Sequence, residues 1–115
     1  MKLLVCGSRD EDDYKFVEKL LEAFHKVSPI TELIHGGCRG VDTLAGNWAI
    51  RNKIAVRVFK ADWAKYGREA GPLRNHAMLV QGKPDRLLAF PGGYVTQDMV
   101  RRAKAAGVPI DGVQD

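Results

Sequence analysis

The apolar positions of this chain follow two patterns, and segments of one pattern alternate with segments of the other from end to end. Short apolar runs, which are typical of buried strands, predict strands at residues 2–6, 32–35, 54–59, 85–90 and 108–110. Between them, apolar residues recur at helical spacing, which predicts helices at residues 12–27, 41–52, 73–82 and 96–106. Alternation of this kind indicates βαβ units, so we expect an α/β fold with a parallel sheet.

The third predicted helix rests on the apolar stripe formed by Leu73, Ala77 and Val80, and it is closed by Gly82-Lys83-Pro84. The last strand contains Pro109, which places that strand at a sheet edge. With right-handed crossovers, five strands and four helices predict one Rossmann-like, three-layer domain. We expect it to span residues 1–115, with strands in the order 3-2-1-4-5.

Composition narrows the class of protein. An apolar content of 45% and a charged content of 28% are typical of a globular domain, and no apolar run approaches a membrane span. The start of the chain lacks the apolar region of a signal peptide, and Cys6 and Cys38 are too few for a disulfide scaffold. We therefore expect a cytoplasmic protein with reduced thiols and no membrane contact.

The net charge of +4 is modest. The local cluster at residues 101–104 is best interpreted as a solvated helix face, because a nucleic-acid footprint is usually a denser basic stripe. This charge balance fits a site for anionic small molecules at least as well as it fits nucleic acid.

Glycine-containing turns follow three of the predicted strands: Gly7-Ser8-Arg9, Gly36-Gly37-Cys38-Arg39-Gly40 and Pro91-Gly92-Gly93. Carboxyl ends of parallel strands share one sheet edge, and ligands bind there at the point where the strand order reverses. Glycine lets the backbone approach a ligand, and a helix N-terminus behind the turn attracts an anion. The three turns together predict a pocket for a phosphate-bearing ligand.

Polar side chains on these turns suit a phosphate or a ribose. Ser8 can donate a hydroxyl hydrogen bond, and Arg9 and Arg39 can make bidentate contacts to phosphate; the alternative for each arginine is an ordinary surface position. Asp42 either accepts from a ribose hydroxyl or stabilises the start of its helix by its charge. Thr96 is predicted as a helix cap, a phosphate contact, or both.

The segment at residues 60–72 is predicted as a long loop with one helical turn, and long loops in compact domains often carry function. Its Trp63 and Tyr66 either stack on a base or pack under the loop. Arg74 and Asn75 open the next helix, and Arg74 is the best candidate for a charge acting on a sugar or phosphate. The predicted ligand-binding residues are Gly7, Ser8, Arg9, Gly36, Gly37, Arg39, Gly40, Asp42, Trp63, Arg74, Asn75, Pro91, Gly92, Gly93, Tyr94 and Thr96.

Other chemistries find little support. His25, His35 and His76 lie in separate elements without metal-ligand spacing, so we predict no metal site. Cys38 has no paired base and is interpreted as an ordinary thiol. The G-x-G-x-x-G fingerprint of dinucleotide-binding domains is absent at Gly7-Ser8-Arg9-Asp10, so no NAD or FAD in the usual mode, and no other cofactor, is predicted.

Taken together, these motifs resemble the SLOG superfamily, and within it the short YspA- and YpsA-related proteins. The stretches that carry the resemblance include Gly7-Ser8-Arg9, residues 35–42, Gly71-Pro72-Leu73-Arg74-Asn75 and Phe90-Pro91-Gly92-Gly93, which run nearly from end to end. The resemblance implies a Rossmann-like fold that binds nucleotides or nucleotide-derived ligands.

The superfamily also contains the LOG (lonely guy) enzymes, which release the base from nucleoside monophosphates by means of an Arg and a Glu. Arg74 matches that Arg and is the only catalytic candidate, whereas Met99 stands where the Glu would be. A thioether can neither stabilise an oxocarbenium ion nor carry a proton. Val95 replaces a usual Gly, so that either the loop takes another shape here or the ligand differs.

We therefore expect a protein that binds a nucleotide-like small molecule, such as a cyclic or ADP-ribose-type signalling nucleotide, as a sensor or a sequestering protein. The alternatives are a LOG-like N-glycosidase and a binder of single-stranded DNA similar to DprA, the DNA-processing protein of the superfamily. The modest charge argues against the DNA alternative. The apolar helical faces of small SLOG domains predict a homodimer or a higher homo-oligomer.

Overall fold

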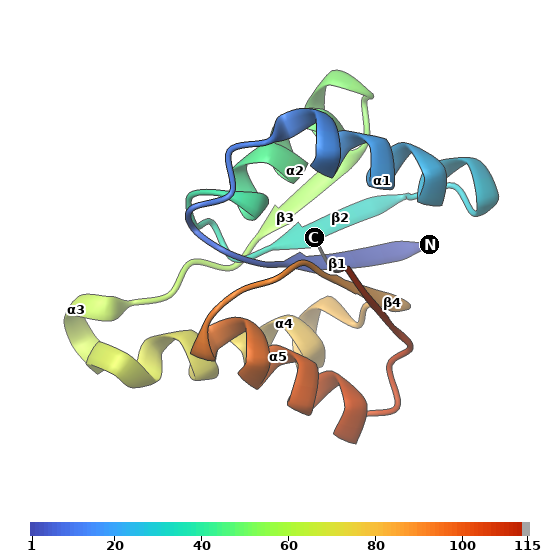
Figure 1. The fold of residues 1–115 in the computed structure, drawn as a ribbon. Helices are drawn as coiled ribbons and strands as arrows, with labels where there is room; N and C mark the ends of the chain where they lie inside the picture. Colours follow the sequence, from blue (N-terminus) through green and yellow to red (C-terminus); the bar gives the residue numbers. More distant parts are fainter. Residues whose placement is uncertain (114–115) are drawn as a thin grey trace.

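The structure, a computed structural model, describes residues 1–113. Its centre is a parallel sheet in the order β3-β2-β1-β4-β5, as predicted (Figure 1). In chain order the strands are β1 (Lys2–Cys6), β2 (Glu32–His35), β3 (Ala55–Val58), β4 (Arg86–Ala89) and β5 (Ile110–Gly112). The α/β class and the Rossmann-like arrangement are thereby confirmed.

Helices cover both faces of the sheet (Figure 1). On one face lie α1 (Tyr14–Val27) and α2 (Val41–Arg51), and on the other lie α4 (Ala70–Gly82) and α5 (Tyr94–Ala105). The short α3 (Trp63–Tyr66) and a 3₁₀ turn, η1 (Gly67–Glu69), lead into α4 and lie beyond the carboxyl ends of the strands. None of the helices in the described part of the chain is long and apolar enough to cross a membrane.

The core has two halves because successive strand residues point to opposite faces of a sheet. Leu3 and Val5 of β1 pack with Trp48 beneath α1 and α2. Leu4, between them in the sequence, packs with Met99 on the α4–α5 side. Full burial of one such side chain stabilises the fold by roughly 1.5–3 kcal/mol, so the two halves hold the strand ends in a fixed arrangement.

The predicted loop at residues 60–72 is largely helical. It contains α3, η1 and the start of α4, which begins at Ala70. Asp62 caps α3, since its Oδ1 accepts a hydrogen bond from the Lys65 N–H at 3.1 Å. The Asx cap starts a helix of only four residues, which is too short to show an apolar period in the sequence.

The helix predicted at residues 73–82 is confirmed as part of α4, but the apolar stripe that predicted it does not face the core. Leu73 and Val80 are 48% and 55% exposed. The inward face instead carries Arg74, Asn75 and Met78, which are all buried. Polar side chains displace the apolar stripe there because they have specific hydrogen-bond partners inside the protein, described below.

The prediction of Thr96 as a helix cap is also wrong. Gly93 precedes the first residue of α5 and makes no side-chain cap, while Thr96 is the third helical residue and is buried. The edge position predicted for the last strand is confirmed, although β5 begins at Ile110, just after Pro109.

Candidate functional site

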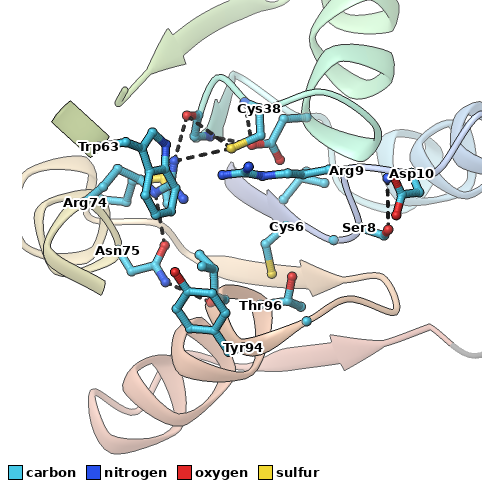
Figure 2. A pocket seen from close by; sticks show the side chains of 17 residues that line it. Cys6, Ser8, Arg9, Asp10, Cys38, Trp63, Arg74, Asn75, Tyr94 and Thr96 are labelled. Atoms are coloured by element: carbon cyan, nitrogen blue, oxygen red, sulfur yellow. Dashed lines mark hydrogen bonds between the residues drawn. The ribbon is translucent and has the colours of Figure 1, made fainter. Parts of the chain in front are cut away.

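A cavity of about 330 Å³ opens at the carboxyl ends of β1, β2 and β4, where the strand order reverses (Figure 2). Its walls come from the turns after these strands, from α3, from the inner face of α4 and from the first turn of α5. The predicted residues that line it are Gly7, Ser8, Arg9, Gly36, Asp42, Trp63, Arg74, Asn75, Gly93, Tyr94 and Thr96. Residues from five separate parts of the chain thus meet at the predicted edge.

Other predicted residues lie near the cavity but do not line it: Gly37, Arg39, Gly40, Pro91 and Gly92. Gly40 has a φ of +75°, and a Cβ there would lie 2.1 Å from the Ser8 carbonyl oxygen. A Cβ on Gly92 would lie 2.3 Å from Thr96 Oγ1. These glycines let neighbouring turns pack against one another rather than leaving room for a ligand.

Arg74 is the most unusual residue of the pocket, because an arginine that is only 7% exposed is buried with its charge. Its Nη1 donates to the Gly36 carbonyl oxygen at 2.7 Å, and its Nε donates to Asn75 Oδ1 at 3.2 Å. Among residues 1–113, no carboxylate lies within 4 Å of it and Nη2 makes no hydrogen bond. A buried cation in this state has donor capacity left for an anion.

Gly36 is required for this placement of the guanidinium. A Cβ on Gly36 would lie 2.2 Å from Arg74 Nη1, far inside van der Waals contact. The turn after β2 and the inner face of α4 are therefore fitted to each other. The missing side chain at this glycine makes room for the protein's own arginine. From its position in a turn we had predicted that it makes room for a ligand.

Asp42 forms the opposite electrostatic pole of the pocket and is also buried. Its Oδ2 accepts hydrogen bonds from the backbone N–H groups of Gly36 at 3.1 Å and of Cys38 at 3.2 Å. Burial raises the pKa of the carboxyl to about 6, and these hydrogen bonds and the charge of Arg74 limit the rise. Asp42 thus stabilises the β2–α2 turn through these backbone contacts. Neither of the two alternatives drawn from the sequence had named them.

Asn75 connects α4 with the start of α5. Its Nδ2 donates to the Val95 carbonyl oxygen at 2.9 Å and to Asp98 Oδ2 at 3.1 Å. Asp98 in turn pairs with Arg102 at 2.8 Å. Since Asn75 Oδ1 also accepts from Arg74, a continuous hydrogen-bonded chain runs from the buried guanidinium to the first turn of α5.

The first turn of α5 forms the lower wall of the pocket in Figure 2. N–H groups at a helix start have no partner within the helix and carry partial positive charge. Val95 lies in this turn with a negative φ and packs beside Gly71, so the loop has a shape that accommodates a β-branched residue.

Met99 lies outside the pocket, wholly buried in the core. The adjacent Asp98 is held by Asn75 and Arg102. Neither residue therefore brings a free carboxylate from α5 to the cavity, where the LOG-like motif would require one.

Two contacts between an arginine and an aromatic ring lie at the edge of the cavity, and Figure 2 labels Arg9 and Trp63 of the first. The Arg9 guanidinium lies 4.8 Å from the centre of the Trp63 ring. On the other side, Arg68 lies 3.9 Å from the centre of the Tyr94 ring, and the Tyr94 hydroxyl donates to the Arg68 carbonyl oxygen at 3.1 Å. Tyr66 is exposed and does not line the cavity. Of the two aromatic residues in the segment predicted as a loop, only Trp63 lines the site.

Sequence analysis had set Cys38 aside as an ordinary thiol, and it missed five other residues of the lining: Val5, Cys6, Asp10, Met78 and Val95. Two of them carried a signal. Cys6 is the last strand residue before the Gly7 turn, and Met78 follows Arg74 by one helical turn, on the same face.

Known proteins match this chain in two comparisons. The model of a family described as "YspA, cpYpsA-related SLOG family" matches residues 1–66. The chain is 35% identical over 117 residues to the Gene 61 protein of Mycobacterium phage D29, an alignment that covers 95% of this chain and 93% of that protein. No solved structure shows a significant match.

Proposed function

This chain belongs to the YspA- and cpYpsA-related SLOG family, and from that premise we propose that its pocket binds a nucleotide or nucleotide-derived small molecule. Membership suggests a function related to nucleotides. The pocket lies at the strand-order reversal, the usual ligand position in open α/β sheets.

The observation that carries the proposal is the buried Arg74, with no carboxylate beside it among the described residues. Burying an unpaired charge costs several kcal/mol, so a protein keeps one where a ligand compensates it. The free Nη2, the N-terminal turn of α5 and the Thr96 hydroxyl line the same cavity. Together they suit a phosphate group.

The remaining lining fits the rest of a nucleotide. Asp42 presents a carboxylate that accepts from sugar hydroxyls, and the Trp63 ring offers a face for a base in place of Arg9. The cavity volume of about 330 Å³ suits a ligand at the small end of the usual range, which starts at roughly 300 Å³. A cyclic or ADP-ribose-type signalling nucleotide would extend past the rim formed by Trp63 and Tyr94.

We propose sensing or sequestration rather than cleavage, because α5 supplies no free carboxylate to the cavity. The second candidate function is N-glycosidic cleavage of a nucleoside monophosphate. Its support is Asp42, a buried carboxylate with a pKa of about 6 in the same cavity as Arg74. Release of free base and ribose 5-phosphate from nucleoside monophosphates distinguishes the two functions.

The proposal includes a homodimer or higher homo-oligomer. Leu73, Ala77 and Val80 form an apolar stripe on the outer side of α4, and the first and last are about half exposed. A second copy of the same stripe, related by two-fold symmetry, is the simplest partner for such a surface. Sedimentation of the purified protein measures this state directly.

The experiment for the ligand is a thermal-shift and calorimetric survey of nucleoside mono- and diphosphates, cyclic nucleotides and ADP-ribose, together with mass spectrometry of whatever co-purifies. A ligand that binds only the folded protein raises the midpoint of unfolding. We expect stabilisation that disappears in Arg74→Gln and persists in Arg101→Gln, a matched change at an exposed arginine of α5 outside this cavity. Equal stabilisation of both variants would contradict the proposal.

A further inference from the structure

Two thiols line the same pocket in opposite settings (Figure 2). Cys6 ends β1 and, like Cys38, is partly exposed as a residue, but burial of its thiol and the charge of Asp42 raise the pKa of that thiol to about 12. Cys38 lies in the β2–α2 turn and is partly exposed, with its Sγ 3.8 Å from Arg74 Nη1. Reactive cysteines are partly exposed and close to cations, whereas enclosed ones are inert.

The backbone of Cys38 is held on both sides. Its N–H donates to Asp42 Oδ2 at 3.2 Å, and its carbonyl oxygen accepts from Thr43 Oγ1 at 2.7 Å. The turn passes through Gly37 and Gly40, both with positive φ. The sulfur lies at the cavity beside the guanidinium, with its thiol 4.0 Å from the Gly36 carbonyl oxygen.

The charge of Arg74 is a second, independent feature, and it indicates which kind of reagent would bind beside this thiol. Arg74 is more than nine-tenths buried as a residue, and its Nη2, which reaches the cavity rather than being sealed in the core, has no hydrogen-bond partner among residues 1–113. Arg9 adds a second cation to the lining. Asp10 and Asp42 line the same cavity and oppose an anion, but Asp42 already accepts two backbone hydrogen bonds through Oδ2. The unsatisfied donor therefore points to an anionic group beside Cys38.

We propose that Cys38 is a covalent modification site for small anionic disulfides, whose negative group pairs with Arg74 while the sulfur reacts. The Cys38 thiol loses its proton to solvent, and the thiolate attacks one sulfur of the disulfide. A Cys38–S–S bond forms as the original S–S bond breaks, and the other half leaves as a thiolate. The group that remains attached lies in the cavity. This inference goes beyond nucleotide binding and does not depend on it.

The test compares an anionic disulfide, dithiobis(nitrobenzoate), with a cationic one, cystamine, on the full chain without nucleotide. Peptide mass spectrometry locates each adduct, and absorbance follows release of the aromatic thiolate. We expect the anionic reagent to modify Cys38 on the order of tenfold faster than Cys6. The fast adduct disappears in Cys38→Ser and persists in Cys6→Ser.

The role of the guanidinium has its own control. Arg74→Gln should lower the ratio of anionic to cationic reaction rates at Cys38 on the order of tenfold, whereas Arg101→Gln should leave that ratio unchanged. Circular dichroism establishes that each variant is folded. If Arg74→Gln does not fold, ionic strength gives the same information on the unmodified protein, since added salt should slow the anionic reagent and speed the cationic one.

The proposal is overturned if Cys6 reacts as fast as Cys38, if Cys38 does not react in the folded protein, or if the rate ratio responds to neither Arg74→Gln nor salt. Because no nucleotide is present in these assays, failure of nucleotide binding leaves their outcome unaffected. The two proposals can therefore fail separately.

Discussion

The two sides of α4 have exchanged their expected roles. The side that faces the sheet edge buries a guanidinium and an amide, with Arg74 at 7% and Asn75 at 1% exposure. The side that faces outward carries Leu73 and Val80, each about half exposed. Hydrophobic burial alone would turn this helix the other way.

The two sides of α4 differ in what they contribute to stability. Burying a charged group with no carboxylate in contact costs several kcal/mol, and a leucine in its place would contribute roughly 2 kcal/mol. The hydrogen bonds from Arg74 to Gly36 and Asn75 and the charge of Asp42 recover part of that cost. The inner side is therefore the one that we propose for the ligand, and the outer side is the one that we propose for contact with a second copy.

The largest effect on this comparison is expected from Gly36→Ala. The new Cβ displaces the Arg74 guanidinium, which lies 2.2 Å from its position, and overpacking of this kind costs roughly 1–3 kcal/mol. Chemical denaturation measures the lost stability, and calorimetry should show lost ligand binding with the charge still present. Gly112→Ala is the control, because a Cβ there meets no atom within 4 Å and Gly112 does not line the pocket. Equal behaviour of the two variants would contradict the close fit of Gly36 to Arg74.

Asn75→Ala is expected to act next most strongly. It removes the donor to the Val95 carbonyl oxygen and the acceptor of Arg74 Nε. Leaving buried polar groups unsatisfied costs about 1–3 kcal/mol. Hydrogen exchange should show weaker protection in the first turns of α5, with the β2–β3 pair unchanged. Unaltered protection at α5 would mean that Asn75 does not connect the two helices.

Asp42→Asn is expected to raise stability at pH 7. The folded-state pKa of Asp42 lies above its ordinary value of 3.8, at about 6, so ionisation disfavours the folded state above that pH. Its contribution is most favourable below pH 4 and is lost as the pH rises through 6. An asparagine oxygen still accepts from Gly36 and Cys38, and the gain at pH 7 is about 1–3 kcal/mol.

Denaturation of wild type and Asp42→Asn between pH 4 and pH 7.5 checks this prediction. The two stabilities should converge as the pH falls and separate as it rises. A wild type that is more stable than Asp42→Asn at pH 7.5, and that loses this advantage as the pH falls, would show that the carboxylate stabilises the fold when ionised.

The smallest effect on the stability of one chain is expected from Leu73→Lys on the outer side of α4. Surface substitutions of this kind usually change stability by no more than about 0.5 kcal/mol. If the stripe joins two copies, sedimentation should show dissociation at the same protein concentration. Ala105→Lys, at an exposed position of α5, adds the same charge outside the stripe and controls for the change in net charge. An unchanged mass would exclude this stripe as the contact between copies.

The strands could be predicted from sequence because each is a short apolar run between turn residues, and parallel crossovers then restrict their order. The side of α4 that faces inward could not be predicted from the sequence. Leu73 and Ala77 each lie one residue before a buried position, Arg74 and Met78, and Val80 lies two residues before the buried Gly82. Only the partner of Arg74, which lies 38 residues earlier at Gly36, decides which stripe turns inward.

The site was predictable in outline for the same reason as the sheet, since strand ends converge wherever parallel strands pair. The part played by each glycine was not. Gly36 and Gly40 make room for Arg74 and for the Ser8 backbone, contacts between segments far apart in the chain. A turn motif in a sequence does not distinguish close approach by a ligand from close approach by the protein itself.

The measurement that tests the central claim most directly is nucleotide affinity by calorimetry for wild type, Arg74→Lys and Arg74→Gln at fixed salt. If Arg74 is the buried cation that receives a phosphate, Arg74→Gln should weaken binding on the order of 100-fold, and Arg74→Lys should retain part of the affinity by its charge. Wild-type affinity in a folded Arg74→Gln variant, or no binding of any nucleotide to wild type, would contradict the account.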